Sequence, residues 1–205
     1  MKKVLLALGF AAIASSAQAY SVDVVPGISP LVGSSMIDFD VDFGDEYVSG
    51  GAIYTASITN ETARPVGSTG GFFSVANSSG QMGPGIFQFE GEINYFGFLW
   101  GSVDTHNVVT LFNEGQEVFS FNGTAFQPHN GDQSQSIYVN IFGGDDEFFD
   151  EIQFSTNSIA FEIDNAGYGV VEVPAEVPVP AALPLMASAL GLFGLSRRKN
   201  KAKLA

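Results

Sequence analysis

Hydrophobic and polar residues alternate repeatedly between residues 20 and 172. In 37–43 every second residue is apolar, which places Asp38, Asp40 and Asp42 together on the opposite face of an extended segment. The same alternation recurs, between clusters of Gly, Asn and Asp, in six later runs: 86–89, 93–98, 118–121, 137–142, 151–154 and 159–164. No long stretch has the period of a helix. The pattern predicts an all-β domain, a single β-sandwich of jelly-roll type spanning residues 20–172.

Two stretches depart from this alternation. Residues 66–85 are rich in glycine, and we expect a long loop that holds one short strand at Phe72–Val75. Long loops of this kind carry function in some domains and are only surface connections in others. Residues 170–179 mix Val with Glu and Pro, which is typical of a last strand that continues as an extended linker.

The first 19 residues have the parts of a secretory signal peptide. Lys2 and Lys3 precede an apolar run, and Ala17 and Ala19 form the small-x-small pattern of a cleavage site. We expect cleavage after Ala19, so that Tyr20 begins the mature protein. The alternative is a retained N-terminal helix.

The last 33 residues, 173–205, have three parts. Residues 173–181 are an extended linker ending in a proline-spaced motif: Val177, Pro178, Val179, Pro180 and Ala181. Residues 182–196 contain no charge, and the basic tail 197–205 begins with Arg197, Arg198 and Lys199. An apolar segment stopped by cations is typical of a helix held in a bilayer with its basic end in the cytoplasm. The segment is short for a permanent anchor, which requires ~20 residues.

This C-terminal pattern resembles the PEP-CTERM class of bacterial sorting signals in its VPLPA variant, with Val179 in place of Leu. The resemblance implies that an exosortase, a membrane peptidase, cuts near the proline motif and releases or transfers the body outside the cell. Residues 87–168, with 95–104 at their centre, also resemble a group of exosortase-dependent surface proteins that have a β-sandwich body. The alternative for the tail is an ordinary C-terminal membrane helix.

The charge of the chain is unevenly distributed. Arg64 is the only Lys or Arg between Tyr20 and Glu176, against all 22 acids of the chain, so this body has a formal charge of −21. Such a body does not bind nucleic acid or anionic lipid by electrostatics. It remains soluble and offers oxygen ligands to divalent cations. There is no cysteine, so the fold depends on its core, with or without a metal.

Trp100, the single tryptophan, allows two interpretations. A flat ring can stack on the apolar face of a sugar while its N–H stays in water. The other role is core packing, which is the commoner one for a lone tryptophan among many phenylalanines.

The acidic residues suggest calcium. Asp38 and Asp40 repel each other on one strand face, and a cation would relieve that repulsion. The body is similar to carbohydrate-binding sandwiches in which calcium links an acid near the first strand to one on the last, and this similarity implies a site made by Asp38, Asp40 and Asp164. A second acidic group lies in one loop: Asp145, Asp146, Glu147 and Asp150. Neither group has the complete spacing of a calcium loop, and a solvated acidic face is the alternative for both.

Enzymatic signatures are weak. His106 and His129 are the only histidines, we expect both in loops, and neither a catalytic triad nor a zinc motif is apparent. Two carboxylates could serve a glycosidase, but 22 acids always supply a pair. We therefore expect no enzyme. The main hypothesis is an exported surface or matrix protein that binds extracellular polysaccharide. The alternatives are an acidic coat protein with no specific ligand and a glycan-active enzyme.

Overall fold

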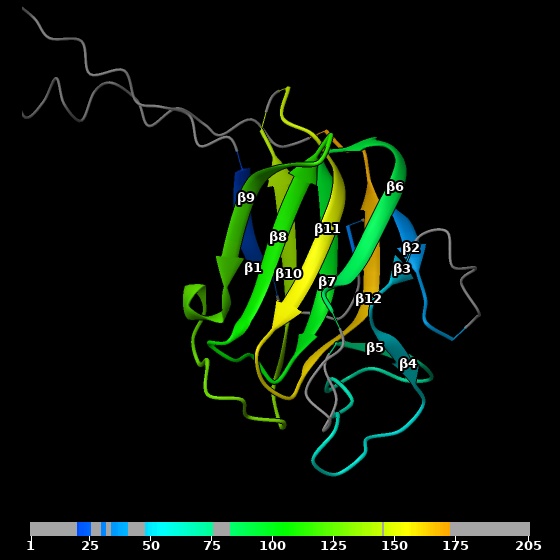
Figure 1. Cartoon of the computed structure of the whole chain (residues 1–205), viewed down its shortest axis with the longest axis vertical. Coiled ribbons are helices and arrows are strands. Elements are labelled where there is room, and N and C mark those ends of the chain that lie inside the picture. Colours follow the sequence, from blue (N-terminus) through cyan, green and yellow to red (C-terminus); the bar gives the residue numbers. More distant parts are fainter. Residues whose placement is uncertain are drawn as a thin grey trace, which may run out of the picture. The chain divides into compact units, whose positions relative to one another are not determined.

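A computed structural model describes residues 20–25, 30–31, 34–40, 48–75, 83–144 and 146–172. These residues form β-strands and loops, with one turn of 3-10 helix, η1 (Gly123–Ala125). The predicted all-β fold is confirmed. The described strands form two antiparallel sheets that pack face to face as a β-sandwich (Figure 1).

Sheet A contains seven of the described strands and sheet B five. Sheet A has the order β1 (Tyr20–Val25), β10 (Ser136–Gly143), β7 (Tyr95–Gly101), β12 (Phe161–Gly169), β5 (Phe72–Val75) and β4 (Ala52–Tyr54), with β2 (Ser35–Ile37) also paired to β12. Sheet B has the order β3 (Val48–Ser49), β6 (Gly85–Ile93), β11 (Phe149–Thr156), β8 (Asn107–Asn113) and β9 (Gln116–Asn122). Every described pair of strands is antiparallel. Several consecutive strands lie in different sheets, as β6, β7 and β8 do, so the loops between them cross from one sheet to the other.

Aromatic side chains fill the space between the sheets. Phe154 from sheet B meets Phe98 and Phe161 from sheet A edge to face, with ring centroids 5.1 and 5.2 Å apart. Phe87 also packs on Phe154, at 5.4 Å. Edge-to-face contacts at these distances are favourable beyond the area they bury. This aromatic core, with no disulfide in the chain, accounts for the stability of the sandwich.

Strand β7 is buried on both faces, which the alternation did not predict. The outer face of sheet A is covered at two places by other parts of the chain. The backbone N–H of Leu31 donates to the Tyr95 hydroxyl at 2.8 Å. In the loop between β4 and β5, Pro65 lies so close to Gly101 that a Cβ there would be 3.0 Å from the proline ring. The outward-facing positions of β7 are therefore interior positions.

Most of the alternating runs lie in strands, but the first does not. Strand β2 ends at Ile37, and the carboxylate of Asp38 accepts a hydrogen bond from the backbone N–H of Asp40 at 3.0 Å. This local bond turns the chain and replaces a sheet hydrogen bond. Asp38 and Asp40 are therefore not on one strand face, and Asp42 lies outside the described residues. The strand predicted at Phe72–Val75 is confirmed as β5.

The predicted last strand also ends earlier than expected. β12 stops at Gly169, and residues 170–172 are not in a strand. Beyond the strand, the side-chain amide of Asn94 holds Val171: it donates to Val171 O at 2.9 Å and accepts from Val171 N at 2.8 Å.

The predictions for both ends of the chain lie outside the described residues. These are the cleavage site at Ala17 and Ala19, the proline-spaced motif of 177–181, the apolar segment 182–196 and the basic residues from Arg197 onward. Within the part of the chain that is described, no helix has the length and apolar character needed to cross a membrane.

Candidate functional site

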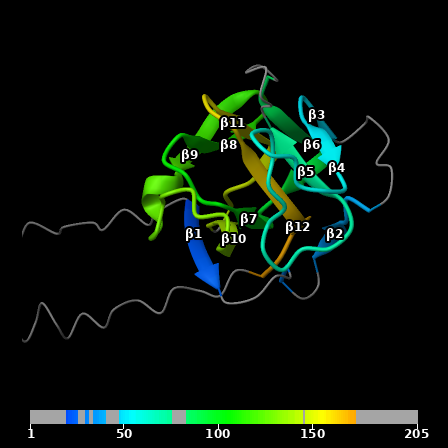
Figure 2. The same cartoon turned by 90° about the horizontal axis from the view of Figure 1, so that it is seen from below.

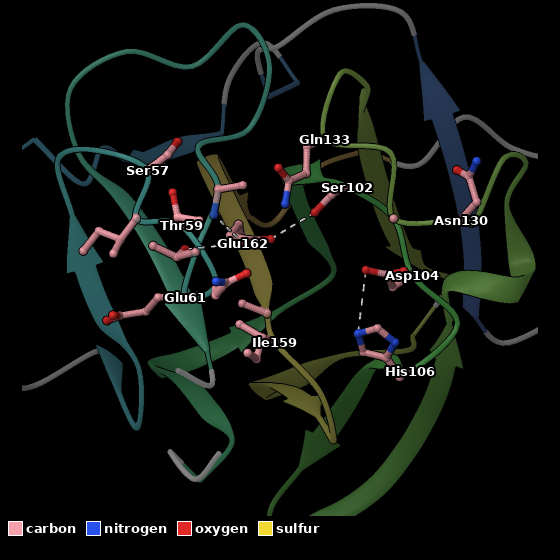
Figure 3. Close-up of a pocket in the computed structure, with 16 residues that line it drawn as sticks. Ser57, Thr59, Glu61, Ser102, Asp104, His106, Asn130, Gln133, Ile159 and Glu162 are labelled. Atoms are coloured by element: carbon pink, nitrogen blue, oxygen red, sulfur yellow. Dashed lines mark hydrogen bonds and ion pairs between the residues drawn. The ribbon is translucent and has the colours of Figure 1, made fainter. Parts of the chain in front are cut away.

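A pocket opens at the end of the sandwich where four connections meet. They join β4 to β5, β7 to β8, β9 to β10 and β11 to β12, and Figure 2 views the molecule from below, toward these loops. We call this cavity, of about 560 Å³, the loop-end pocket. Its lining consists of residues 57–63, Ser102, Asp104, His106, Asn130, Gly131, Gln133, Ile159, Ala160 and Glu162 (Figure 3).

Glu162 holds two of these loops in place. It lies on the outer face of sheet A near the start of β12 and is only 2% exposed. The backbone N–H of Ala63 donates to its Oε1 at 2.7 Å, and the Ser102 hydroxyl donates to its Oε2 at 3.1 Å. Burial raises the pKa of Glu162, and these hydrogen bonds oppose that increase. With both oxygens bonded, Glu162 is an anchor for the β4–β5 and β7–β8 loops.

Asp104 and His106 lie on the other side of the pocket, in the loop after β7 (Figure 3). The Asp104 Oδ2 is 3.7 Å from the His106 Nε2, and both side chains are about one-fifth exposed. Burial raises the pKa of Asp104, and His106 opposes this effect. A distance of 3.7 Å is too long for a hydrogen bond. The Asp104 carboxylate can therefore still accept hydrogen bonds from a ligand.

The rest of the lining is mainly hydroxyl and amide groups. They belong to Ser57, Thr59, Asn60, Asn130 and Gln133, and all five residues are exposed. Ile159 and Ala160 form one apolar wall. Asn107 fixes the position of this wall, because its side-chain N–H donates to Ala160 O at 3.3 Å. A polar lining with one apolar wall suits a ligand that has many hydroxyls and an apolar face.

Trp100 does not line this pocket. Its side chain is fully buried, and its ring stacks on Phe161 with centroids 4.6 Å apart. A ring without exposed surface cannot stack on a sugar from solvent. The sugar-platform interpretation is therefore corrected to core packing, the alternative that the sequence left open.

Asp38, Asp40 and Asp164 are near one another. Asp38 and Asp40 are exposed, whereas Asp164 on β12 is 1% exposed. Burial raises the pKa of Asp164 to about 6; the hydrogen bond from the backbone N–H of Asn165 and the nearby Ser68 hydroxyl oppose the increase, and the charges of Asp38 and Asp40 add to it. Across the described residues, however, no group of three or more His, Cys, Asp and Glu side chains is arranged to hold a metal ion.

The second acidic group, at residues 145–150, does not form a metal-binding cluster within the described part of the chain. Asp145 lies outside the described residues, and Asp146 is exposed. Asp150 accepts a hydrogen bond from the backbone N–H of Glu114 at 3.1 Å, which ties it to the turn between β8 and β9. His106 and His129 both lie in loops, as expected.

No local pattern in the sequence predicts the loop-end pocket. Asp104 and His106 are two residues apart in the loop after β7. This short spacing is the one feature of the sequence that could have predicted that their side chains lie together. Glu162 lies between Phe161 and Ile163, where alternation predicts an exposed side chain. Its burial depends on the β4–β5 loop, which is about a hundred residues earlier in the chain.

Comparison with known proteins adds no assignment, because no family model, curated protein or solved structure matches this chain.

Proposed function

We propose that this chain is an exported surface or matrix protein whose β-sandwich binds extracellular polysaccharide in the loop-end pocket. The observation that carries the proposal is the pocket itself. Its cavity of about 560 Å³ is within the range typical of ligand sites, roughly 300–1,000 Å³. Hydroxyl and amide groups line it beside the apolar wall of Ile159 and Ala160. Sugar rings present the matching combination of hydroxyls and apolar C–H faces.

The sorting part of the proposal comes from the two ends of the sequence. A signal peptide ending at Ala19 directs export, and the motif 177–181 with its basic stop resembles an exosortase signal. In this scheme the apolar segment 182–196 holds the protein in the membrane until the peptidase acts. The mature body then lies at the cell surface or in the extracellular matrix.

The sandwich belongs, in our proposal, to the jelly-roll type. The eight consecutive strands from β5 to β12 support this assignment. They form the orders β10-β7-β12-β5 in sheet A and β6-β11-β8-β9 in sheet B. Two interlocked Greek keys produce this distribution of consecutive strands between two sheets.

A structural calcium ion remains part of the proposal. The carboxylates of Asp38 and Asp40 lie close enough to raise the pKa of Asp164. Three acids in mutual electrostatic range repel one another, and a divalent cation would remove that repulsion. Oxygen ligands from the backbone or water would have to complete the site.

The glycan-active enzyme is the second candidate, because Asp104 and Glu162 line one pocket and burial raises the pKa of both. A general acid must reach the glycosidic oxygen of its substrate. Glu162 is 2% exposed and accepts hydrogen bonds at both oxygens, so it is poorly placed to do so. We therefore favour binding without turnover.

The test is cosedimentation of the purified protein with exopolysaccharide, combined with two matched variants. Gln133→Ala removes an exposed amide from the pocket, whereas Gln116→Ala removes an exposed amide from the start of β9. Loss of one hydrogen bond predicts about fivefold weaker binding for Gln133→Ala and no change for Gln116→Ala. Absence of binding would favour the coat protein, and equal effects of the two variants would exclude the loop-end pocket as the binding site. Release of sugar from the polysaccharide would favour the enzyme.

A further inference from the structure

The loop-end pocket has an unbalanced charge. Three carboxylates line it, those of Glu61, Asp104 and Glu162, and no lysine or arginine does. Arg64, the only Lys or Arg between Tyr20 and Glu176, is held elsewhere. Its guanidinium donates to the carbonyl oxygen of Thr55 and lies 5.1 Å from the centroid of the Phe72 ring. Apart from His106, the pocket therefore contains no side chain that can offset a negative charge.

The three carboxylates differ in how far they are engaged by hydrogen bonds within the protein. Both oxygens of Glu162 accept hydrogen bonds inside the protein. Glu61 Oε1 accepts from the Tyr54 hydroxyl at 2.8 Å. Among the described residues the carboxylate of Asp104 accepts no hydrogen bond, and its polar neighbour is His106 at 3.7 Å, so it is the carboxylate most available to a ligand. Gly131 allows the β9–β10 loop to pass close to this carboxylate, because a Cβ at Gly131 would be 2.6 Å from Asp104 Oδ1.

We infer that the loop-end pocket selects a sugar unit bearing an ammonium group, which binds against the carboxylate of Asp104. This inference rests on the proposed function and names the class of glycan: a hexosamine with a free amine. An ammonium supplies the charge-assisted hydrogen bonds that a half-buried carboxylate lacks. A uronate would instead place a further negative charge beside Asp104 and Glu162. An N-acetylated hexosamine has the same ring but no charge.

The acidity of the whole body could imitate this selectivity. A formal charge of −21 between Tyr20 and Glu176 attracts any polycation, whether or not it enters the pocket. The probes must therefore carry at most one charge, and the experiment must contain salt. At an ionic strength of about 0.15 M, charges further than ~8 Å away are largely screened.

The experiment is an NMR titration of the purified full-length protein with three methyl glycosides, each of a single pyranose ring. They are methyl glucosaminide, methyl N-acetylglucosaminide and methyl glucuronide. We expect the free amine to bind about tenfold more tightly than the acetylated sugar and the glucuronide to bind most weakly.

Two variants locate the effect. Asp104→Asn keeps the shape of the side chain and removes its charge, and it should bring the amine to the affinity of the acetylated sugar. Glu117→Gln removes one charge from an exposed position on β9 outside the pocket lining, and it should leave the tenfold preference unchanged.

The outcomes separate the two proposals. A preference for the amine that is lost in Asp104→Asn and kept in Glu117→Gln supports the inference. Equal binding of amine and acetylated sugar, or tightest binding of the glucuronide, overturns the inference and leaves polysaccharide binding intact. If the wild-type protein binds none of the three sugars and no polysaccharide, both proposals fail. If Asp104→Asn does not fold, a wild-type preference for the amine that is kept in Glu117→Gln at this ionic strength supports the inference, and its loss in Glu117→Gln overturns it.

Discussion

Replacing Asp164 with asparagine should stabilise the protein at neutral pH. Asp164 is 1% exposed, and its Oδ1 accepts a hydrogen bond from the backbone N–H of Asn165 at 2.7 Å. The amide oxygen of an asparagine can accept the same bond. The substitution therefore keeps the shape and this contact of the side chain and removes a charge that burial disfavours.

The magnitude follows from the pKa of Asp164, which burial raises from 3.8 to about 6. A carboxyl whose pKa is higher in the folded state binds its proton more tightly there. The free energy of unfolding therefore falls as pH rises from about 4 to about 6, and it stays lower above that range. About two pKa units correspond to ~2.7 kcal/mol. Because asparagine does not titrate, Asp164→Asn should be ~2 kcal/mol more stable than the wild type at pH 7 and nearly equal at pH 4.

Urea unfolding at pH 4 and pH 7 measures this difference. Trp100 is the single tryptophan and is fully buried, so its fluorescence reports global unfolding. A chelator must be present, because bound calcium would hold the carboxylate in its charged form. Glu117→Gln, an exposed position, is the control for the change in net charge. A variant less stable than the wild type at pH 7, or a difference that does not depend on pH, would refute the reasoning.

Four further predictions concern the core, the loop anchor, calcium and the tail. Trp100→Ala should lower the free energy of unfolding by ~3–5 kcal/mol. Trp100→Phe should cost much less, because the buried Nε1 has no hydrogen-bond partner among the described residues. Equal losses of the two variants in urea unfolding would contradict this. Glu162→Ala leaves the Ala63 N–H without its acceptor and should lower the free energy of unfolding by ~1–3 kcal/mol. Glu162→Gln keeps an acceptor oxygen and should retain most of the wild-type stability in the same assay. If calcium binds at Asp164, the melting temperature should be higher in calcium than in chelator, and Asp164→Asn should remove the increase; equal melting temperatures would exclude the site. Neutral residues in place of Arg197, Arg198 and Lys199 should impair retention and processing, and an unchanged mature mass and location would contradict the sorting proposal.

The sequence by itself determined the β-structure, because alternation and turn residues act locally. A strand places successive side chains on opposite faces, so the runs in β6, β9, β10 and β11 were recognisable without knowledge of their neighbours. The short strand Phe72–Val75 was also predicted, from four non-glycine residues within a glycine-rich stretch. The run at 37–43 misled, because an aspartate can replace the sheet by bonding to a nearby backbone N–H, as Asp38 does.

Only the tertiary structure decided which polar and aromatic residues are buried. Trp100 belongs to the core because the two sheets enclose it, and strand β7 is buried on its outer face because the β4–β5 loop and residues near Leu31 lie over it. The loop-end pocket has the same origin. Glu162 meets Ala63 across 99 positions of sequence, and such a contact depends on where a distant loop folds. Local pattern specifies which face a side chain occupies, whereas burial depends on what covers that face.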